Sequence, residues 1–269
     1  MLYCSGFKSI MKKFMISKAK ISFIKSLHSN KGRNETGLFI AEGVKIAKEL
    51  LSSQNIKIHS IFATKDFLEQ NNLNSNSNFE IYEISEIELQ KISLLSNPNK
   101  VLVIAEIFKN KLDFSALKNE LTIVLDNVQD PGNLGTIIRT MDWFGIKNLV
   151  CSETTVDVYN PKVIQASMGS FMRVNSYYTN IENFIKEYSS KFDYKVYGTL
   201  LNGNNIYKET LEQEGIIVFG NESKGISRNI EKLITNRISI PSFSNSNNID
   251  SLNISIAAGI LFSEFKRTS

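Results

Sequence analysis

Three segments in the second half of the chain combine glycine with amide, hydroxyl and charged side chains that could bind a ligand. They are NVQDPGNLGTIIRT (127–140), FGNESKGIS (219–227) and IPSFSNSNNIDSLNIS (240–255). Each begins at the end of a short apolar run, and α/β proteins bind their ligands at the carboxyl ends of strands. Three such loops in one chain predict a single composite site.

The first segment predicts a helix that begins at a turn. Pro131 and Gly132 favour the turn, and Asn133 is a residue type that caps helices with its side chain. Gly135 allows the backbone to lie close to a ligand, and Arg139, one helical turn later, could point back toward the loop. A capped helix with an ordinary surface arginine explains the same residues when this segment is considered alone.

The second segment contains two glycines separated by four residues, Gly220 and Gly225, as phosphate-binding loops do. In those loops Lys and then Ser or Thr follow, whereas Ile226 follows here, so the phosphate-loop interpretation fails. Glu222 is instead a candidate anchor for a polar ligand. The alternative for Glu222 is a surface acid that precedes a helix.

The third segment leads into the last helix. Pro241 ends an apolar run, and Ser251 is expected to cap the helix with its hydroxyl. Asn253 falls in the first helical turn, where a stronger helix former would be expected. This early asparagine therefore indicates a role beyond helix formation.

Together, the segments resemble the motifs of the SpoU/TrmH family of SPOUT methyltransferases, over about residues 121–269. The family's first motif is matched by Asn127, Asn133, Gly135 and Arg139, and its second, G-x-E-x-x-G, by Gly220, Glu222 and Gly225. Its third, I-P then S-L-N-x-S-x-A, is matched by Ile240, Pro241, Ser251, Leu252, Asn253, Ser255 and Ala257. The stretch between Pro241 and Ser251 is a few residues longer than in the family pattern. KGRNETGLFIAEG (31–43) more weakly resembles the family's N-terminal substrate-binding domain, which folds like small RNA-binding ribosomal proteins.

This resemblance implies an S-adenosylmethionine-dependent enzyme that methylates a ribose 2′-hydroxyl in structured RNA, with rRNA expected before tRNA. It also implies a deep trefoil knot in the parallel-sheet domain, and a homodimer with Pro161–Arg173 and the last helix as candidate contact surfaces. The implied catalytic residues are Arg139, Asn133, Glu222, Ser251 and Asn253, and the implied cofactor-binding residues are Thr199, Leu200, Gly220, Asn221, Ile240 and Leu252. Because a guanidinium stays protonated, we expect Arg139 to stabilise a developing alkoxide rather than to act as a base. No metal is implied.

Periodic apolar patterns predict the elements that position these loops. Helices are expected over 17–28, 43–52 and 85–95, and strands over 58–63, 79–84 and 101–107, in a small α/β domain at 17–108. The family resemblance implies that this domain binds RNA. After a charged linker at 109–120, strands at 121–126, 148–151, 173–178, 195–201, 215–220 and 237–241 alternate with helices at 132–144, 161–170, 181–192, 227–233 and 251–267. This alternation predicts that 121–269 is a parallel sheet covered on both faces. Residues 1–16 are expected to be a disordered extension.

Positive charge is concentrated near the N-terminus. Residues 1–48 hold ten lysines and arginines against two acidic residues, while the whole chain has a net charge of +4. This asymmetry predicts a polyanionic partner, and the family resemblance makes that partner RNA, with Lys20, Lys31 and Arg33 as expected phosphate contacts. From charge alone, a solvated lysine-rich helix is the alternative.

Cysteine content and hydropathy indicate the compartment. Two cysteines cannot form a disulfide framework or a zinc site. Neither a membrane-spanning run nor a secretory signal is apparent, so we expect a cytoplasmic protein.

Other functions fit parts of the pattern. A catalytically inactive RNA-binding or ribosome-assembly protein could keep the fold, although it would be free to lose Arg139, Glu222 and Asn253. A dinucleotide-dependent oxidoreductase would need a G-x-G-x-x-G turn between a strand and a helix, which the sequence lacks. A purely structural module gives no reason for three polar loops at strand ends.

Overall fold

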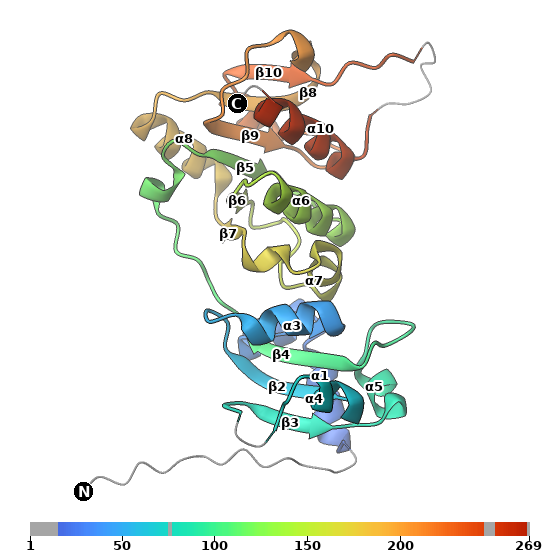
Figure 1. Cartoon of the computed structure of the whole chain (residues 1–269). Coiled ribbons are helices and arrows are strands. Elements are labelled where there is room, and N and C mark those ends of the chain that lie inside the picture. Colours follow the sequence, from blue (N-terminus) through green and yellow to red (C-terminus); the bar gives the residue numbers. More distant parts are fainter. Residues whose placement is uncertain (1–15, 75–76, 245–250, 268–269) are drawn as a thin grey trace, which may run out of the picture. The chain divides into compact units, whose positions relative to one another are not determined.

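A computed structural model describes residues 16–74, 77–244 and 251–267, which divide into two compact units. The first unit contains the chain up to Phe108 together with Tyr159–Gln165, and the second contains Lys109–Val158 and the chain from Ala166 onward. Figure 1 shows the elements of both units, labelled where there is room. The predicted N-terminal extension lies outside the described residues, apart from its last residue, Ile16.

The first unit is built on a mixed four-stranded sheet. Its strands are β1 (Leu38–Glu42), β2 (Ile58–Ala63), β3 (Glu80–Glu83) and β4 (Val101–Glu106), and its helices are α1 (Lys18–Ser26), α2 (Asn30–Thr36), α3 (Val44–Ser52), α4 (Lys65–Gln70) and α5 (Glu86–Ile92). The strand order is β1-β4-β2-β3, with β4 antiparallel to both neighbours and β2 parallel to β3. Three of these elements, α2, β1 and α4, were not predicted from the sequence.

The second unit is built on a six-stranded parallel sheet. Its strands are β5 (Leu121–Leu125), β6 (Asn148–Cys151), β7 (Asn175–Tyr178), β8 (Val196–Asn205), β9 (Gly215–Phe219) and β10 (Asn236–Ser239). Its helices are α6 (Pro131–Trp143), α8 (Ile181–Lys191), α9 (Arg228–Glu231) and α10 (Ile254–Arg267), while α7 (Pro161–Ser167) begins in the segment assigned to the first unit. The strand order is β10-β8-β9-β5-β6-β7, and all the pairs are parallel. The predicted parallel sheet is therefore confirmed.

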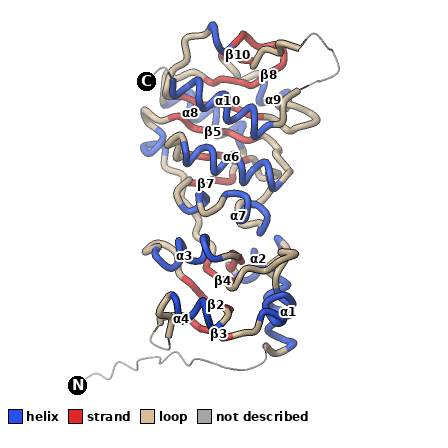
Figure 2. Tube along the Cα trace, turned by 45° about the vertical axis from the view of Figure 1, so that its right-hand side comes forward, coloured by secondary structure: helices blue, strands red, loops and turns tan. Residues whose placement is uncertain are grey.

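Helices cover both faces of this sheet, as parallel strands require. Figures 1 and 2 both show α6 and α10 side by side on one face, where the Phe262 ring of α10 packs against Phe219 of β9. Helices α8 and α9 pack together on the other face, over a core that includes Val124, Val150 and Val218. Every residue of β5 and β9 is buried, which makes these two strands a rigid base for the loops that follow them.

Two predicted helix caps are wrong. Asp130 caps α6, because its Oδ1 accepts a hydrogen bond of 2.7 Å from the backbone N of Asn133, and Pro131 then occupies the first helical position. The last helix begins at Ile254 and not at 251, so Asn253 stands in the capping position where Ser251 was expected. In both places an acidic or amide side chain caps the helix.

The predicted trefoil knot depends on the path of the segment after Pro241. Residues 245–250 of that segment, which make up most of the stretch that is longer than the family pattern, lie outside the described residues.

Candidate functional site

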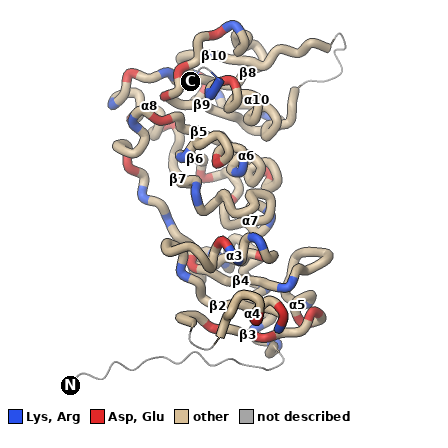
Figure 3. Tube along the Cα trace, viewed as in Figure 1, with Lys and Arg blue, Asp and Glu red and all other residues tan. Residues whose placement is uncertain are grey.

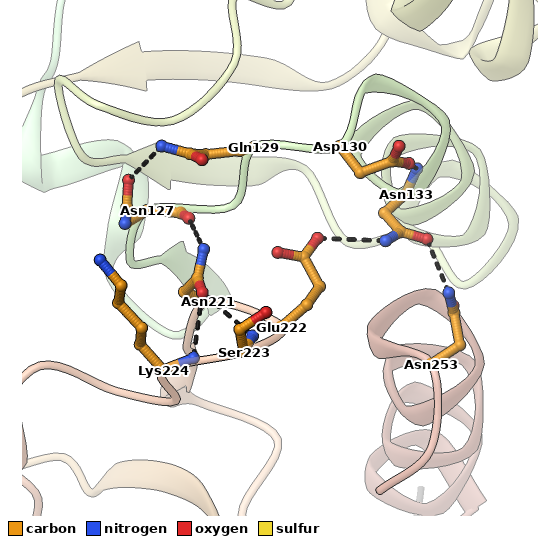
Figure 4. Close-up of a pocket in the computed structure, with 9 residues that line it drawn as sticks. All are labelled: Asn127, Gln129, Asp130, Asn133, Asn221, Glu222, Ser223, Lys224 and Asn253. Atoms are coloured by element: carbon orange, nitrogen blue, oxygen red, sulfur yellow. Dashed lines mark hydrogen bonds between the residues drawn. The ribbon is translucent and has the colours of Figure 1, made fainter.

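A polar pocket lies at the carboxyl ends of β5 and β9, where the first two loops meet and Asn253 of the third segment joins them (Figure 4). These strands pair in register, with Leu125 opposite Phe219, so the loops that follow them start at the same level. The order of the sheet also reverses here, since β6 and β7 extend from one side of β5 and β9 lies on the other, and such switch points are common ligand sites. The residues that line the pocket are Asn127, Gln129, Asp130, Asn133, Asn221, Glu222, Ser223, Lys224 and Asn253.

Asn127 and Asn221 join the first two loops. Asn127 has a left-handed backbone conformation (φ +58°), which asparagine tolerates better than most residues, and its N–H donates to the hydroxyl of Ser152 at 2.9 Å. The side-chain amide of Asn221 donates to the carbonyl of Asn127 at 2.8 Å. The Oδ1 of Asn221 accepts from the backbone amides of Ser223 and Lys224, both at 3.0 Å. Asn221 thus shapes its own loop and ties it to the first one.

The second loop is closed by its glycines. Asn221 and Gly225 exchange two backbone hydrogen bonds, at 3.0 and 2.8 Å, and Gly225 adopts φ +68°. A Cβ atom on Gly220 would lie 2.2 Å from backbone atoms of Gly225 and Ile226, so only glycine fits there. The buried carboxylate of Asp126 accepts from the backbone N of Ser227 at 2.7 Å, a contact that the sequence analysis did not foresee.

Glu222, Asn133 and Asn253 form a chain of hydrogen bonds that joins all three loops. The Nδ2 of Asn133 donates to Glu222 Oε1 at 3.1 Å, and Asn133 Oδ1 accepts from Asn253 Nδ2 at 2.9 Å. The Oδ1 of Asn253 accepts from the backbone amides of Ser255, at 2.9 Å, and Ile256, at 3.4 Å. Figure 4 shows the three side chains pointing toward one another.

The order of donors and acceptors in this chain is fixed at both ends. An ionised carboxylate can only accept, so the NH₂ group of Asn133 must face Glu222 and its oxygen must face Asn253. At the other end, the free amides of the first turn of α10 require the oxygen of Asn253. Each asparagine therefore keeps one N–H for a ligand, and Glu222 keeps its second oxygen.

Two predicted catalytic residues lie outside this pocket. Arg139 is exposed on α6, six residues beyond Asn133, a separation that turns its side chain to a different side of the helix. Ser251 is exposed and does not line the pocket either. Within one chain, the structure brings together Asn133, Glu222 and Asn253 but not the whole predicted set.

Most of the predicted cofactor-binding residues lie in or directly after three neighbouring strands, β8, β9 and β10. Thr199 in β8 follows Gly198, which pairs with Val218 of β9 and with Arg237 of β10. Because β8 and β9 are parallel, Thr199 lies at the level of Phe219, one residue before Gly220. Ile240 directly follows the last residue of β10. The ladder between β8 and β10 skips from Gly198 to Asn204, which releases Thr199, Leu200 and their neighbours from pairing with β10.

Exposed apolar side chains belong to the same segments. Leu201 is 81% exposed, Phe243 is 85% exposed, and Leu252, itself a predicted cofactor residue, is 48% exposed. Exposed side chains of this size suit the apolar and aromatic surface of an adenosine group better than solvent. This part of the structure therefore fits an adenosyl cofactor.

The predicted RNA contacts in the first unit differ in accessibility. Lys31 is a surface side chain, 85% exposed, whose Nζ lies 3.8 Å from Glu35 Oε1 in an exposed ion pair. Lys20 is less available, because its Nζ lies 3.5 Å from Glu80 and 5.0 Å from the centre of the Tyr82 ring. Arg33 is 1% exposed and donates to the carbonyls of Leu27 and His28, so the expectation that it contacts phosphate is wrong. Figure 3 shows acidic segments next to basic ones in this unit.

Four pocket residues were not predicted from the sequence. Asp130 could have been recognised as a cap because it immediately precedes Pro131. Gln129, whose amide donates to Asn127 Oδ1 at 3.2 Å, gave no signal. Ser223 and Lys224 stand at the variable positions of G-x-E-x-x-G, where a family pattern assigns no role.

Other chemistries find little support in the described parts of the chain. Burial raises the pKa of the Cys151 thiol to about 12, so this group is not a thiolate nucleophile at neutral pH. No group of three or more His, Cys, Asp or Glu side chains that could hold a metal ion occurs among residues 16–74, 77–244 and 251–267. Within the same ranges, no helix has the length and apolar character needed to cross a bilayer.

Comparisons with known families and structures identify the family of this chain. Residues 120–263 match the SpoU rRNA methylase family, and residues 18–103 match the MRM3-like substrate binding domain. Among curated relatives, the "23S rRNA (guanosine(2553)-2′-O)-methyltransferase RlmP" of Bacillus subtilis is 29% identical, over 90% of this chain and 94% of its own length.

Solved structures of related proteins are similar to this structure over nearly the whole chain. A putative RNA methyltransferase of the TrmH family from Porphyromonas gingivalis is 33% identical with a TM-score of 0.84, covering 95% of this chain and all of its own. An rRNA methyltransferase from Sinorhizobium meliloti, solved with S-adenosylmethionine bound, is 26% identical with the same TM-score, over 97% and 98% of the two chains. The chain therefore belongs to the SpoU rRNA methylase family and is an S-adenosylmethionine-dependent RNA 2′-O-methyltransferase.

Proposed function

We propose that this chain transfers a methyl group from S-adenosylmethionine to a ribose 2′-hydroxyl of ribosomal RNA, with the ribose bound at Glu222, Asn133 and Asn253. The observation that carries the proposal is the hydrogen-bond chain between these residues, one from each of the three loops. The family match and the rRNA-modifying relatives support rRNA as the substrate. A transfer RNA substrate is the alternative that the experiment below distinguishes.

The free groups of the hydrogen-bond chain suit a ribose hydroxyl, which both donates and accepts. Glu222 can accept the hydroxyl hydrogen with its second carboxylate oxygen, and the spare N–H of Asn133 or Asn253 can donate to the hydroxyl oxygen. These contacts would hold the hydroxyl oxygen in a fixed position toward the methyl donor, and such alignment is the main requirement of this reaction. S-adenosylmethionine, when bound, supplies a methyl group activated by its sulfonium. The new bond joins the 2′-oxygen to the methyl carbon as the carbon–sulfur bond breaks, and the hydroxyl proton leaves toward the carboxylate or an adjacent phosphate.

The cofactor is assigned to the middle of β8, where the ladder to β10 is interrupted, and to the carboxyl ends of β9 and β10. The register of β8 with β9 supports this assignment for Thr199 and Gly220, and Ile240 directly follows β10. Leu200 and Leu252 would supply apolar contacts, and Asn221 fixes the loop after β9. Gly220 packs directly against the backbone of Gly225 and Ile226, which leaves no room for a Cβ atom and fixes the shape of the loop after β9.

Arg139 is assigned to the site through a homodimer. Its exposed position on α6 leaves it outside the pocket of its own chain, so a second copy, or RNA that spans both copies, would have to use it. The helices α6 and α10, which pack on each other, also carry Trp143 at 85% exposure and Ile256 at 55%. Two large apolar side chains on adjacent helices support this face as the contact between the two copies.

The chain is proposed to divide these tasks between its two halves. Residues 17–108 would bind the RNA, with Lys31 as the more available of the two surface lysines, and residues 121–269 would carry out the transfer, with 109–120 as the linker. The match of residues 18–103 to a substrate-binding domain supports this division.

Mapping 2′-O-methylation in rRNA and tRNA from cells with and without this gene tests the function. We expect one rRNA position to lose its methyl group, and to regain it with the wild-type gene but not with a Glu222→Gln variant. Loss of methylation at a tRNA position alone would replace rRNA as the substrate, and unchanged methylation of both would contradict the proposal. Binding of S-adenosylmethionine, measured by calorimetry on the purified chain, separates an inactive RNA-binding protein from an enzyme whose target was missed.

A further inference from the structure

The pocket at β5 and β9 contains a single basic side chain, Lys224. The other lining residues are neutral apart from two carboxylates, and both of these have partners within the pocket. Asp130 is held by the backbone N of Asn133 at 2.7 Å, and Glu222 by the side chain of Asn133 at 3.1 Å. Lys224 forms no ion pair or hydrogen bond through its ammonium group with any part of the chain that the structure describes. The charge of Lys224 is therefore not paired with either carboxylate of the pocket.

The backbone at Lys224 is nevertheless held in place. Its N–H donates to Asn221 Oδ1 at 3.0 Å, and Asn221 is in turn bound to the carbonyl of Asn127. Gly225, the next residue, closes the loop in a left-handed conformation with two hydrogen bonds back to Asn221. The loop thus fixes where the lysine side chain starts and leaves the ammonium group free to meet a ligand.

The ammonium group and the hydrogen-bond chain occupy different sides of the pocket. Figure 4 shows Lys224 beside Asn127, with Glu222 between it and Asn133, and Asn253 beyond Asn133. One side therefore offers a point charge and the other offers paired hydrogen-bond donors and acceptors. A nucleotide presents the matching pair of groups, a phosphate and the ribose hydroxyl next to it.

We propose that Lys224 binds a backbone phosphate of the RNA next to the ribose held by Glu222, Asn133 and Asn253, and so positions that ribose for methylation. This inference rests on the proposed function. It concerns a position that the G-x-E-x-x-G pattern leaves open, so it describes this chain and not its motif. Lysine suits the role because an ammonium group binds phosphate as a compact point charge.

The test measures RNA affinity and methylation with an unmodified transcript of large-subunit rRNA. Lys224→Gln should weaken RNA binding about three- to tenfold at physiological salt and lower the slope of log affinity against log salt by about one. Lys224→Arg, which keeps the charge, should retain most of the affinity. Lys208→Gln is the matched control, because Lys208 is exposed in the same unit and does not line the pocket. Binding of S-adenosylmethionine should be the same in all four proteins.

The outcomes separate this inference from the proposed function. Binding and its salt dependence are measured with S-adenosylhomocysteine present and without turnover, so they test Lys224 whether or not the transcript is methylated. An unchanged affinity and salt slope in Lys224→Gln would overturn the phosphate contact. An equal loss of affinity in Lys224→Arg and Lys224→Gln would overturn it too, since the charge would then be irrelevant. If the wild-type chain binds the cofactor and the transcript but methylates no ribose in it, the proposed function fails while the result for Lys224 stands.

Discussion

Replacing Asn253 by aspartate separates the two tasks of this side chain. Its oxygen caps α10 by accepting from the amides of Ser255 and Ile256, and its NH₂ group donates to Asn133 at 2.9 Å. Aspartate is as good a cap as asparagine, and its charge is favourable at a helix N-terminus. It has no hydrogen to donate when ionised, so Asn253→Asp keeps the first task and removes the second.

Losing this hydrogen bond reverses the direction of donation between the three side chains Glu222, Asn133 and residue 253. Asn133 would have to turn its NH₂ group toward the new carboxylate, and its oxygen would then face Glu222, where both atoms are acceptors. A hydrogen bond to a charged group contributes about 1.5–3 kcal/mol, so losing the donor to Glu222 in the transition state should lower kcat/KM by about 10- to 150-fold. The stability of the second unit should change little.

Asn253→Ala is the matched comparison, because it removes both tasks. Loss of a cap costs about 1 kcal/mol, which corresponds to a fall in melting temperature of about 2–4 °C for a protein of this size. Single-turnover methylation and thermal unfolding of both variants provide the measurements. Full activity in Asn253→Asp would refute the view that the bond to Asn133 positions Glu222, and an unchanged melting temperature in Asn253→Ala would refute the cap.

Three further substitutions test other parts of the structure. Gly220→Ala puts a Cβ 2.2 Å from backbone, so calorimetry should show at least tenfold weaker S-adenosylmethionine binding, whereas Gly259→Ala, with its nearest neighbour at 3.8 Å, should bind normally. Arg33→Met leaves the carbonyls of Leu27 and His28 without their donor and should destabilise the first unit by about 1–3 kcal/mol in denaturant unfolding, without changing the salt dependence of RNA binding. Lys31→Met should leave that stability unchanged and lower the salt dependence of RNA binding. Trp143→Glu should shift the proposed dimer to monomer in light scattering while leaving the circular dichroism spectrum unchanged, and a dimer that persists would place the interface elsewhere.

The sequence was sufficient to predict the parallel sheet and the loops that carry the site. Buried strands such as 121–125 and 215–219 are nearly continuous apolar runs. Gly225 marks a backbone conformation that few other residues adopt, and Gly220 marks a close approach of two backbone segments. Both signals are local, so they can be recognised without knowledge of the fold. The elements that were not predicted, α2, β1 and α4, are short. A short element contains too few residues for a helical or alternating apolar pattern to be recognised.

Side-chain partners were harder to predict because they depend on contacts distant in sequence. Arg33 looked like a phosphate contact because it stands in a basic segment, but it is buried and bound to the carbonyls of Leu27 and His28. Charge counted along a sequence does not distinguish an exposed arginine from one that satisfies backbone carbonyls. The same limit applies to Arg139, whose residue type indicated a role but whose position on α6 shows that its own chain does not place it in the pocket.

Competition for one helix end explains why Asn133 is available to the site at all. Either Asp130 or Asn133 could cap a helix near Pro131, and the chain would lose the hydrogen-bond chain to Glu222 and Asn253 if Asn133 did so. Asp130 stands immediately before the proline, and its carboxylate takes the backbone N–H of Asn133 at 2.7 Å, so the cap is filled by the residue that is also favoured by the helix dipole. That contact fixes the backbone of Asn133 and frees its side chain for Glu222. Asp130 therefore supports the site indirectly: it accepts from a free backbone N–H at the start of α6, and no contact with the substrate is needed for this role.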